Sequence, residues 1–429
     1  MPNAVLLDGV RTPLVRSGTA LRDIHAKELG RRVVRETLER SGTPADRVDE
    51  IIVGNAGTPS DAPNIARVIG LMAGLPESTP GLTVHRNCAS GMEAVILAAA
   101  KITSGEARLI VAAGTENLSR APMVLPPEAN PWFVRWSRAR SIPAKLAALR
   151  ALRPRDMMPH PALLDGLTDP VCGLSMGRTA EVLAREFGIS REEQDEFALS
   201  SHLRAVDAWE DGRIAEEVTP VFVGPGFKKV IEKDVGPREN QTTEALSGLR
   251  PVFERRDGTV TAGNSCQVTD GAAAVVVASE DYAAELGLTP VAKILGTATA
   301  GLSPRRMGLG PAYATPLALD HAGVRMADID RIEINEAFAA QVIANERAFA
   351  SDRFASEELG RASATGEIRR DRLNADGGAI ALGHPIGATG TRLVVTLLRQ
   401  LRQSGGALGL ATLCVGGGQG SAIVMERVS

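Results

Sequence analysis

The sequence predicts an α/β fold made of two similar halves, with a long excursion that leaves the first half and returns to it. Short apolar segments alternate with helical segments over residues 1–120 and again over residues 286–429. Residues 121–250 lose this alternation, and residues 251–285 are assigned to the return into the first half. Strands that alternate with helices form sheets covered by helices on both faces.

The elements expected in the first half follow one another as strand and helix, and this order favours parallel strands. Ala26–Ser41 has the pattern of an amphipathic helix. The expected strands are Ala4–Asp8, Glu50–Gly54, Leu82–Asn87 and Leu109–Ala113, and the other expected helices are Ala62–Ala73 and Ser90–Thr103.

The second half repeats the order of the first. Val48–Ile51 (VDEI) opens a strand in the first half, and Ile329–Ile332 (IDRI) opens one in the second. A helix that ends in Ser104-Gly105 leads to the strand ARLIVAAG, and a helix that ends in Ser404-Gly405 leads to ALGLATLCVGGG. The match is weak residue by residue but consistent in order, which indicates a duplicated fold.

The excursion contains prolines, few strands and the helical segments Thr179–Glu186 and Arg191–Gly212. Because loops over a rigid α/β scaffold commonly bind ligands, we expect this region to contribute to a binding site.

Composition excludes several classes of protein. A net charge of −3 and an aromatic content of 3% give no basis for nucleic-acid binding. None of the four cysteines forms a C-x-x-C pair with another, so neither a metal site nor a redox pair is predicted. The first residues, MPNAVLLDGVRTP, lack the apolar core of a signal peptide, and no apolar run reaches the length of a membrane span. We therefore expect a cytoplasmic protein without disulfides.

One basic segment stands out within the excursion. Residues 131–155 carry seven arginines and lysines, no acidic residue, and the aromatic residues Trp132, Phe133 and Trp136. This composition suits a peripheral contact with a membrane surface or with an acidic partner. The alternative is a solvated helical face whose aromatic residues pack on the same subunit. The polar segment Ser351–Asp371 is a second insertion to which no function is assigned.

The stretch Asn374–Gly390, NADGGAIALGHPIGATG, predicts a crowded turn before a helix. Its glycines allow close approach of the backbone, and the following residues have helical spacing. His384 therefore lies near a helix N-terminus, where negative charge is favoured. Taken alone, His384 is equally consistent with a structural role.

Two cysteines and an asparagine lie at comparable junctions. Cys88 follows a strand and precedes a helix, a position that lowers the pKa of a thiol. Cys414 precedes three glycines whose N–H groups can surround an oxyanion. Asn335 lies in EINEAFAAQ. Two thiols and an imidazole permit covalent acyl transfer together with a separate proton transfer. The alternatives are inert buried thiols and an asparagine that only caps a helix.

Five ordered motifs, NCASGMEA, TAGN…DGAAA, NEAFAAQ, GGAIALGHPIGATG and CVGGGQG, resemble those of the thiolase family over nearly the whole chain. The resemblance implies a five-layered α/β/α/β/α thiolase fold of two similar halves. It also implies a loop domain that binds coenzyme A, here residues 121–250, and a homodimer or homotetramer. Coenzyme A thioesters would be the substrates, coenzyme A itself would be a substrate, and no cofactor or metal would be needed.

The resemblance also implies roles for individual residues. Cys88 would be the acylated nucleophile, His384 would activate it, and Cys414 would be the acid or base that acts on acetyl-CoA. His384 and a water held by Asn335 would form one oxyanion hole, and the N–H groups of Cys88 and Gly416 would form the other.

Weaker correspondences concern the substrate. Arg238 would lie near the adenine of coenzyme A, and Met176 and Phe338 would contact the substrate. Cys266 stands where the family has a serine that contacts coenzyme A, so Ser265 is expected to supply that hydrogen bond. We expect His85 to pack rather than catalyse, and Cys172 to be structural.

The sequence Ser175-Met176-Gly177 resembles degradative 3-ketoacyl-CoA thiolases of fatty-acid β-oxidation. The basic segment 131–155 resembles thiolase subunits that associate with a hydratase/dehydrogenase. Two alternatives remain: acetoacetyl-CoA synthesis by the same chemistry, and a lipid-carrier or scaffold protein that has lost catalysis.

Overall fold

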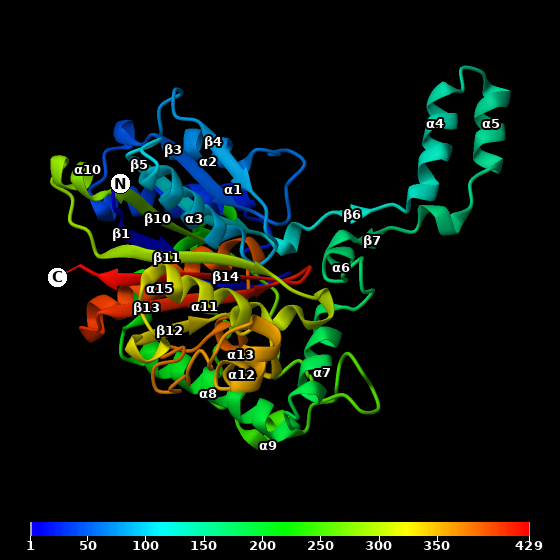
Figure 1. Ribbon diagram of the computed structural model, residues 1–429. Coiled ribbons are helices and arrows are strands. Elements are labelled where there is room, and N and C mark those ends of the chain that lie inside the picture. The colour runs from blue at the N-terminus through cyan, green and yellow to red at the C-terminus, as the bar shows by residue number, and fades with distance from the viewer. Residues whose placement is uncertain (1, 429) are drawn as a thin grey trace.

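A single mixed sheet runs through both halves of the chain in the computed structural model, which describes residues 2–428 (Figure 1). Its strand order is β12-β13-β14-β11-β1-β10-β5-β3-β4, and the halves join where Val5 and Leu6 of β1 pair with β11. The strands of the first half are β1 (Ala4–Arg11), β3 (Glu50–Gly54), β4 (Gly81–Val84), β5 (Leu109–Glu116) and β10 (Thr269–Ser279), and β2 (Val15–Arg16) pairs with β10. The strands of the second half are β11 (Ala292–Gly301), β12 (Arg331–Ile334), β13 (Leu408–Val415) and β14 (Gln419–Arg427).

Helices cover both faces of each half and produce five layers. Helices α1 (Ala26–Ser41) and α2 (Ile65–Ala73) pack on the outer face of the first half. Helices α11 (Gly310–Ala322) and α12 (Ala339–Phe349) pack on the outer face of the second half. Between the two halves of the sheet lie α3 (Ser90–Thr103) and α15 (Ile386–Ser404), so the five-layered α/β/α/β/α prediction is confirmed.

The layers follow from the alternation of side chains along each strand. Along β3, Ile51 and Val53 enter the outer core while Ile52 enters the central one. Along β13, Leu410 faces the outer core of the second half, and Ala411 and Leu413 face the central core. Each strand is thus apolar on both faces, which explains its continuous hydrophobic run.

The expectation of parallel strands is correct for the four strands predicted in the first half, because β1 and β5 are both antiparallel to β10 and therefore run in the same direction, but the sheet as a whole is mixed. β3 pairs in parallel with β4 and β5, and β12 pairs in parallel with β13. In contrast, β10 is antiparallel to β1 and β5, and β14 is antiparallel to β11 and β13. A tight β13–β14 hairpin requires antiparallel strands, and β10 returns only after the excursion, without a crossover helix that would set its direction.

Matching contacts confirm the internal duplication. The Asp49 carboxylate accepts the backbone N–H groups of Arg108 and Leu109 at 2.7 and 2.9 Å. The Asp330 carboxylate accepts those of Ala407 and Leu408 at 2.7 and 3.1 Å. Asp49 and Asp330 therefore occupy equivalent positions, and each holds the start of a pair of parallel strands, β3 with β5 and β12 with β13.

Several element boundaries agree with the sequence prediction. Helices α1 and α3 and strand β3 begin and end at the predicted residues. β4 is shorter than the predicted strand Leu82–Asn87, because the chain turns before Asn87, which has a φ of 42°. Few residues other than glycine adopt positive φ, and asparagine is one of them.

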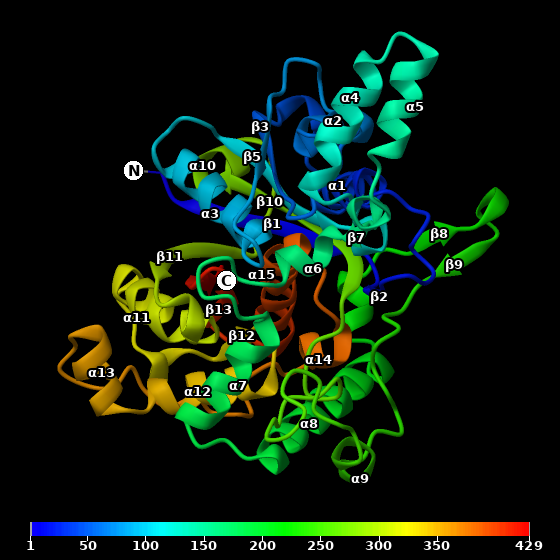
Figure 2. The ribbon, with the colours of Figure 1, turned by 90° about the vertical axis from the view of Figure 1, so that its right-hand side faces the viewer.

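The excursion consists of helices and short hairpins. Its helices are α4 (Asn130–Arg138), α5 (Ile142–Arg150), α6 (Ala162–Gly166), α7 (Met176–Glu186), α8 (Arg191–Glu210) and α9 (Thr243–Ser247), and its strands are β6 (Met123–Val124), β7 (His160–Pro161), β8 (Val221–Val223) and β9 (Lys229–Ile231). Helices α4 and α5 form a hairpin that projects far from the layered body (Figures 1 and 2). The remaining short helices are α10 (Glu280–Glu285), α13 (Asp352–Leu359) in the second insertion, and α14 (Ala379–Leu382). Across residues 2–428, none of the helices has both the length and the apolar character of a membrane span.

Candidate active site

The two central helices converge at their N-terminal ends, and this crossing gathers the predicted site. The Thr391 hydroxyl of α15 donates a hydrogen bond of 2.9 Å to the Gly91 carbonyl of α3. A Cβ added to Gly390 would lie 2.6 Å from the Met92 Cβ, so glycine is required for this close approach. Cys88 and His384 each precede one of these helices by a few residues and are therefore brought to the same end of the central layer.

The turn that carries Cys88 is fastened to the loop after β13. The Asn87 side chain donates to the Gly416 carbonyl at 2.7 Å, and the Ser90 hydroxyl donates to the Asn87 carbonyl at 2.7 Å. The Gly416 N–H in turn donates to the Cys88 thiol. The predicted pair of N–H groups, those of Cys88 and Gly416, thus lies beside the Cys88 sulfur.

The predicted lowering of the Cys88 pKa is wrong. Burial among the surrounding residues raises the pKa of the Cys88 thiol, and the negative charge of Glu116 adds to the increase. The N–H groups of Gly416 and Cys88 act in the opposite direction but do not compensate. Because desolvation exceeds the helix-terminus effect, Cys88 is a neutral thiol in the resting protein.

His384 is held as a neutral imidazole. Its Nδ1 lies 2.6 Å from the Thr389 hydroxyl, which itself donates to the Pro385 carbonyl at 3.2 Å. A hydroxyl that donates to a carbonyl has only lone pairs left for Nδ1, so Nδ1 carries the proton and Nε2 is the free base. Burial, assisted by the charge of Arg392, lowers the pKa of His384 to about 3.

Cys414 and Cys266 lie beside Cys88. Burial raises the pKa of Cys414 well above its ordinary value, and the charges of a Cys88 and a Cys266 thiolate would raise it further. Burial and then the Cys88 charge raise the pKa of Cys266 to about 12. Charge interactions among all three sulfurs require them to be near neighbours. Cys414 is buried with Phe338 in one apolar cluster, against which Met176 packs.

Asn335 is fully buried just after β12, and its backbone N–H donates to the Thr412 carbonyl at 3.1 Å. Within residues 2–428, neither side-chain atom of Asn335 has a hydrogen-bond partner, and the same holds for Nε2 of His384. The alternative of a helix cap is excluded, because the N-cap of α12 is Phe338. Buried polar atoms in this condition are costly, and they mark sites that bind water or substrate.

An apolar cavity of about 290 Å³ opens beside Cys88. Three predicted residues, Cys88, Met176 and Gly416, line it, whereas His384, Asn335 and Cys414 lie buried outside its lining. The other lining residues are Ala56, Gly57, Thr58, His85, Asn87, Leu118, Ala121, Pro122, Ala162, Leu163, Gly166, Leu167 and Ile386.

The predicted contacts Arg238, Ser265, Cys266 and Phe338 are not among the residues that line this cavity. The Ser265 hydroxyl already donates to the Thr261 carbonyl at 2.6 Å, and the Cys266 N–H donates to the Ala337 carbonyl at 3.0 Å. Phe338 stacks edge-on against Phe253, with 6.1 Å between ring centroids. Arg238 is exposed and lies near His202 of α8.

Several residues of the site were not predicted from the sequence. His85 was expected only to pack, yet it lines the cavity, and its Nε2 lies 3.1 Å from the Ala56 carbonyl. The sequence analysis predicts no role for Thr389 or Glu116. Thr389 lies five residues after His384, and Glu116 is an acidic residue at the end of an apolar strand, so both positions are recognisable in the sequence.

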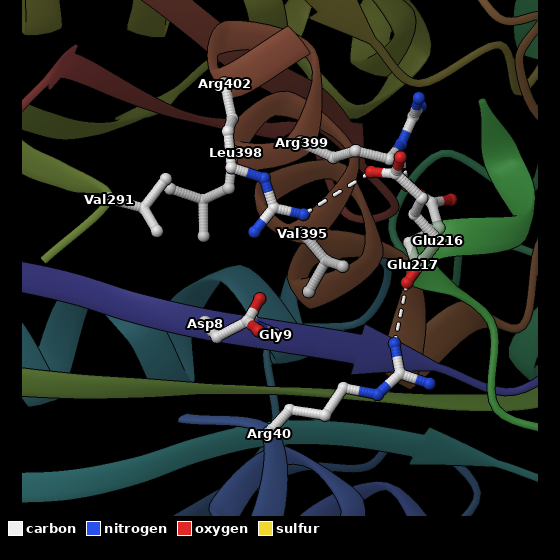
Figure 3. A pocket seen from close by; sticks show the side chains of 10 residues that line it. All are labelled: Asp8, Gly9, Arg40, Glu216, Glu217, Val291, Val395, Leu398, Arg399 and Arg402. Carbon is white, nitrogen blue, oxygen red and sulfur yellow. Dashed lines mark hydrogen bonds and ion pairs between the residues drawn. The ribbon is translucent and has the colours of Figure 1, made fainter. Parts of the chain in front are cut away.

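A second cavity, of about 350 Å³, lies between β1 and α15 and has a different character (Figure 3). It is lined by charged side chains, among them Arg399, Glu217 and Arg402, and by none of the predicted site residues. Arg399 and Glu217 are paired at 2.9 Å, so these charges already satisfy one another. This cavity lies where the two halves meet, and its charged lining does not suit an acyl chain.

Comparisons with known proteins agree with this geometry. The family description "Thiolase, N-terminal domain" matches residues 4–281, and "Thiolase, C-terminal domain" matches residues 288–427. The chain is 43% identical over 422 residues to the 3-ketoacyl-CoA thiolase of Pectobacterium carotovorum, covering 98% of this chain and 95% of that protein. The 3-ketoacyl-CoA thiolase of Klebsiella pneumoniae is 42% identical over 422 residues, covering 98% and 96%.

Solved structures show the same likeness. The acetyl-CoA acetyltransferase of Bacillus anthracis superposes with a TM-score of 0.87 at 37% identity, covering 100% of this chain and 99% of that one. Human mitochondrial 3-ketoacyl-CoA thiolase superposes with a TM-score of 0.87 at 35% identity and the same coverage. With matching family descriptions over almost its whole length, this chain belongs to the thiolase family.

Proposed function

We propose that this chain cleaves 3-ketoacyl-CoA with coenzyme A and yields acetyl-CoA and an acyl-CoA shortened by two carbons. The Cys88 thiol gives its proton to Nε2 of His384, and its sulfur attacks the keto carbon. The neutral state of both groups requires this transfer to occur as the substrate binds. The N–H groups of Cys88 and Gly416 then donate to the oxygen of the former ketone.

The bond between the α-carbon and the keto carbon breaks next, and its electron pair stays on acetyl-CoA. The thioester oxygen takes up negative charge and accepts a hydrogen bond from protonated His384 and from a water held by Asn335. Cys414 protonates the α-carbon, and acetyl-CoA leaves. The Cys414 thiolate then takes the proton of an incoming coenzyme A thiol, whose sulfur attacks the acyl group on Cys88. The Cys88 sulfur leaves and recovers its proton from His384.

The observation that carries this proposal is the apolar cavity beside the Cys88 sulfur. Leu163, Leu167 and Met176, together with Ile386 across from them, offer a surface that suits an acyl chain longer than acetyl. Coenzyme A is a substrate in this scheme, and we assign no cofactor or metal. Arg238, Ser265, Cys266 and Phe338 remain proposed contacts of the coenzyme A portion.

Acetoacetyl-CoA synthesis is the second candidate, because the chain resembles an acetyl-CoA acetyltransferase structure as closely as it resembles a 3-ketoacyl-CoA thiolase structure. Thiolysis rates for a series of 3-ketoacyl-CoA substrates of increasing chain length separate the two. We expect turnover to extend well beyond the four-carbon substrate. Activity confined to acetoacetyl-CoA would favour synthesis, and no turnover of any member would favour a lipid-carrier or scaffold role.

We also propose that the chain works in the cytoplasm as a homodimer or homotetramer. β4 is the last strand of the sheet, so one of its edges has no strand beside it among residues 2–428, and its Leu82 side chain is 38% exposed. Exposed strand edges readily pair with a second copy. Sedimentation equilibrium tests this proposal, and a monomer at the working concentration would contradict it.

The α4–α5 hairpin supports a further proposal, a peripheral contact with an anionic lipid surface. Trp132 and Trp136 are stacked at 5.6 Å, and Trp132 donates to the Ala148 carbonyl, so the tryptophans fasten α4 to α5. The alternative of aromatics packed within the same subunit is thus partly correct. Ile142, Leu146 and Leu149 nevertheless remain 76%, 52% and 46% exposed along one stripe of α5, surrounded by basic residues and no acidic ones.

Flotation with phosphatidylcholine vesicles, with or without phosphatidylglycerol, tests this contact. We expect binding only to the anionic vesicles, and we expect the variant Ile142→Ser/Leu146→Ser/Leu149→Ser to lose it while thiolysis in solution is unchanged. Leu71→Ser/Leu203→Ser, which alters exposed leucines elsewhere, is the control. Absence of binding, combined with capture of a hydratase/dehydrogenase by the unaltered hairpin, would assign the surface to a protein partner instead.

A further inference from the structure

Glu116 ends the strand β5 as a buried carboxylate that no arginine, lysine or histidine of residues 2–428 pairs with. Four N–H donors surround it instead. Oε1 accepts from the Gly57 backbone at 3.0 Å and from the Asn55 side chain at 3.0 Å. Oε2 accepts from the Ala56 backbone at 3.0 Å and from the Gly387 backbone at 2.9 Å.

These donors belong to two separate walls of the acyl cavity. Residues 56–58 line it from the first half of the chain, and Ile386 lines it from the second. Gly387 follows Ile386 and lies three residues after His384. The carboxylate of Glu116 therefore joins one wall of the cavity to the segment that carries the catalytic imidazole.

The surrounding backbone is shaped to admit this carboxylate. A Cβ added to Gly57 would lie 2.8 Å from Oε1, and a Cβ added to Gly387 would lie 2.7 Å from Oε2. Side chains at either position would push the carboxylate away from its donors. The absence of a side chain at Gly57 and at Gly387 therefore lets both backbone segments approach the Glu116 carboxylate.

The charge state of Glu116 is finely balanced. Burial raises the pKa of Glu116 to about 7, and the four N–H donors oppose the increase. The nearby titratable groups on the packed elements are Cys88 before α3, Asp270 on β10 bonded to Ser119, His384 bonded to Thr389, and His25 before α1 bonded to Asp61. Of these, Cys88 is the group whose pKa the Glu116 charge raises.

We propose that Glu116 is a positioning residue of this thiolase, whose ionised carboxylate fixes residues 55–57 and the start of α15 relative to Cys88. The proposal rests on the thiolysis proposed above and deepens it. In the ionised form all four N–H groups are satisfied. Protonation turns one carboxylate oxygen into an O–H group that faces two N–H donors. Those donors lose their acceptor, and the part of the cavity wall that carries them is no longer held.

The variant Glu116→Gln tests this role. Whichever way its amide is turned, the NH₂ group faces two N–H donors, so one wall must move. We expect kcat to fall by roughly 10- to 100-fold, as small displacements of reacting groups do, with KM for coenzyme A changed by less than about threefold. The control is Asp330→Asn. Asp330 precedes β12, at the end of that strand away from Asn335, and its carboxylate accepts two backbone N–H groups there.

The pH profile separates positioning from a general structural role. In the unaltered protein, kcat should fall as the pH drops below about 7, and Glu116→Gln should lack this limb while Asp330→Asn keeps it. Asn55→Ala removes one donor and should shift the limb to higher pH. If the unaltered protein turns over substrate with no limb near pH 7, or if Glu116→Gln retains full kcat, the inference is overturned. If the unaltered protein does not turn over substrate, the proposed function fails instead.

Discussion

At the scale of single residues, the site is built from neutral groups that become charged only during reaction. The thiol of Cys88 and the imidazole of His384 are both desolvated. Burial raises the pKa of Cys88 and lowers the pKa of His384, and both shifts favour the neutral form. A preformed ion pair between them is therefore disfavoured. In the proposed mechanism, substrate binding supplies the charge stabilisation for proton transfer, with the N–H groups of Cys88 and Gly416 as donors to the developing oxyanion.

Thr389 allows this idea to be tested on one hydroxyl. Thr389→Val removes the acceptor for Nδ1 of His384, so the imidazole can adopt the tautomer whose Nε2 carries a proton and cannot act as a base. We expect kcat to fall by about tenfold or more, while KM for coenzyme A changes little. Thr389→Ser retains the hydroxyl and should retain most of the activity; equal losses in steady-state assays of both variants would contradict the tautomer argument.

The sequence located much of this site but not its electrostatics. Cys88, Gly416 and Met176 share the cavity, and Cys414 lies in the adjoining apolar cluster, as their motifs suggested. The direction of the Cys88 pKa shift was wrong because a helix N-terminus is visible in sequence, whereas the burial that outweighs it is not. Glu116 was overlooked because its four donors come from segments that are up to 271 positions apart from it.

At the scale of elements, the crossing of α3 and α15 determines the site. Both helices enter the central layer from different halves, and their contact near Gly91 and Gly390 aligns the turns that precede them. Cys88 and His384, the proposed nucleophile and base, lie on those turns, while the helices behind them are packed in the central core.

Gly390→Ala is expected to disturb this crossing severely. The added Cβ would lie 2.6 Å from the Met92 Cβ and 2.8 Å from its Cα, and backbone atoms cannot move aside cheaply. We expect a loss of about 3 kcal/mol in the free energy of unfolding, with a matching loss of activity. Gly166→Ala, where an added Cβ would meet no atom within 4 Å, is the control for urea denaturation. Equal midpoints for the two variants would show that the helices are not tightly packed there.

Local patterns and the shared direction of β1, β3, β4 and β5 were predictable from the sequence, whereas the antiparallel strand β10 between β1 and β5 was not. The helical period of α1 and the segment VDEI are local features, and the limits of α1 and β3 are predicted correctly from such features. The direction of β10 depends on β1 and β5, with which it pairs after an excursion of about 150 residues, so the alternation of strands and helices does not determine it.

At the scale of the whole molecule, a buried ionic network joins the halves and the excursion. Arg399 of α15 contacts Glu217 at 2.9 Å and Asp376 at 2.6 Å, and Arg11 of β1 contacts the same Glu217 at 2.6 Å. Burial acts to raise the pKa of Glu217, but the charges of Arg399 and Arg11 outweigh it and hold the pKa below its ordinary value.

Arg399→Met should therefore destabilise the whole fold. Removing one partner leaves buried carboxylates undercompensated, at a cost of about 3–5 kcal/mol in the free energy of unfolding. Arg402→Met, three residues later and half exposed, breaks a surface pair with Glu216 and should cost about 1 kcal/mol or less. Since the folded pKa of Glu217 is depressed, its contribution is present above pH 4.5 and is lost as the pH falls below it. Urea titrations at pH 7 and pH 4 that show the same cost for Arg399→Met would contradict this account.

Acylation of the resting protein tests the proposal that the Cys88 sulfur, beside the apolar cavity, attacks the keto carbon of a 3-ketoacyl-CoA. The protein is mixed with a long-chain 3-ketoacyl-CoA in the absence of free coenzyme A and then mapped by peptide mass spectrometry. We expect an acyl group two carbons shorter than the substrate, attached to Cys88, with release of one acetyl-CoA for each modified chain. An acyl group of undiminished length, or one attached to a residue other than Cys88, would contradict it.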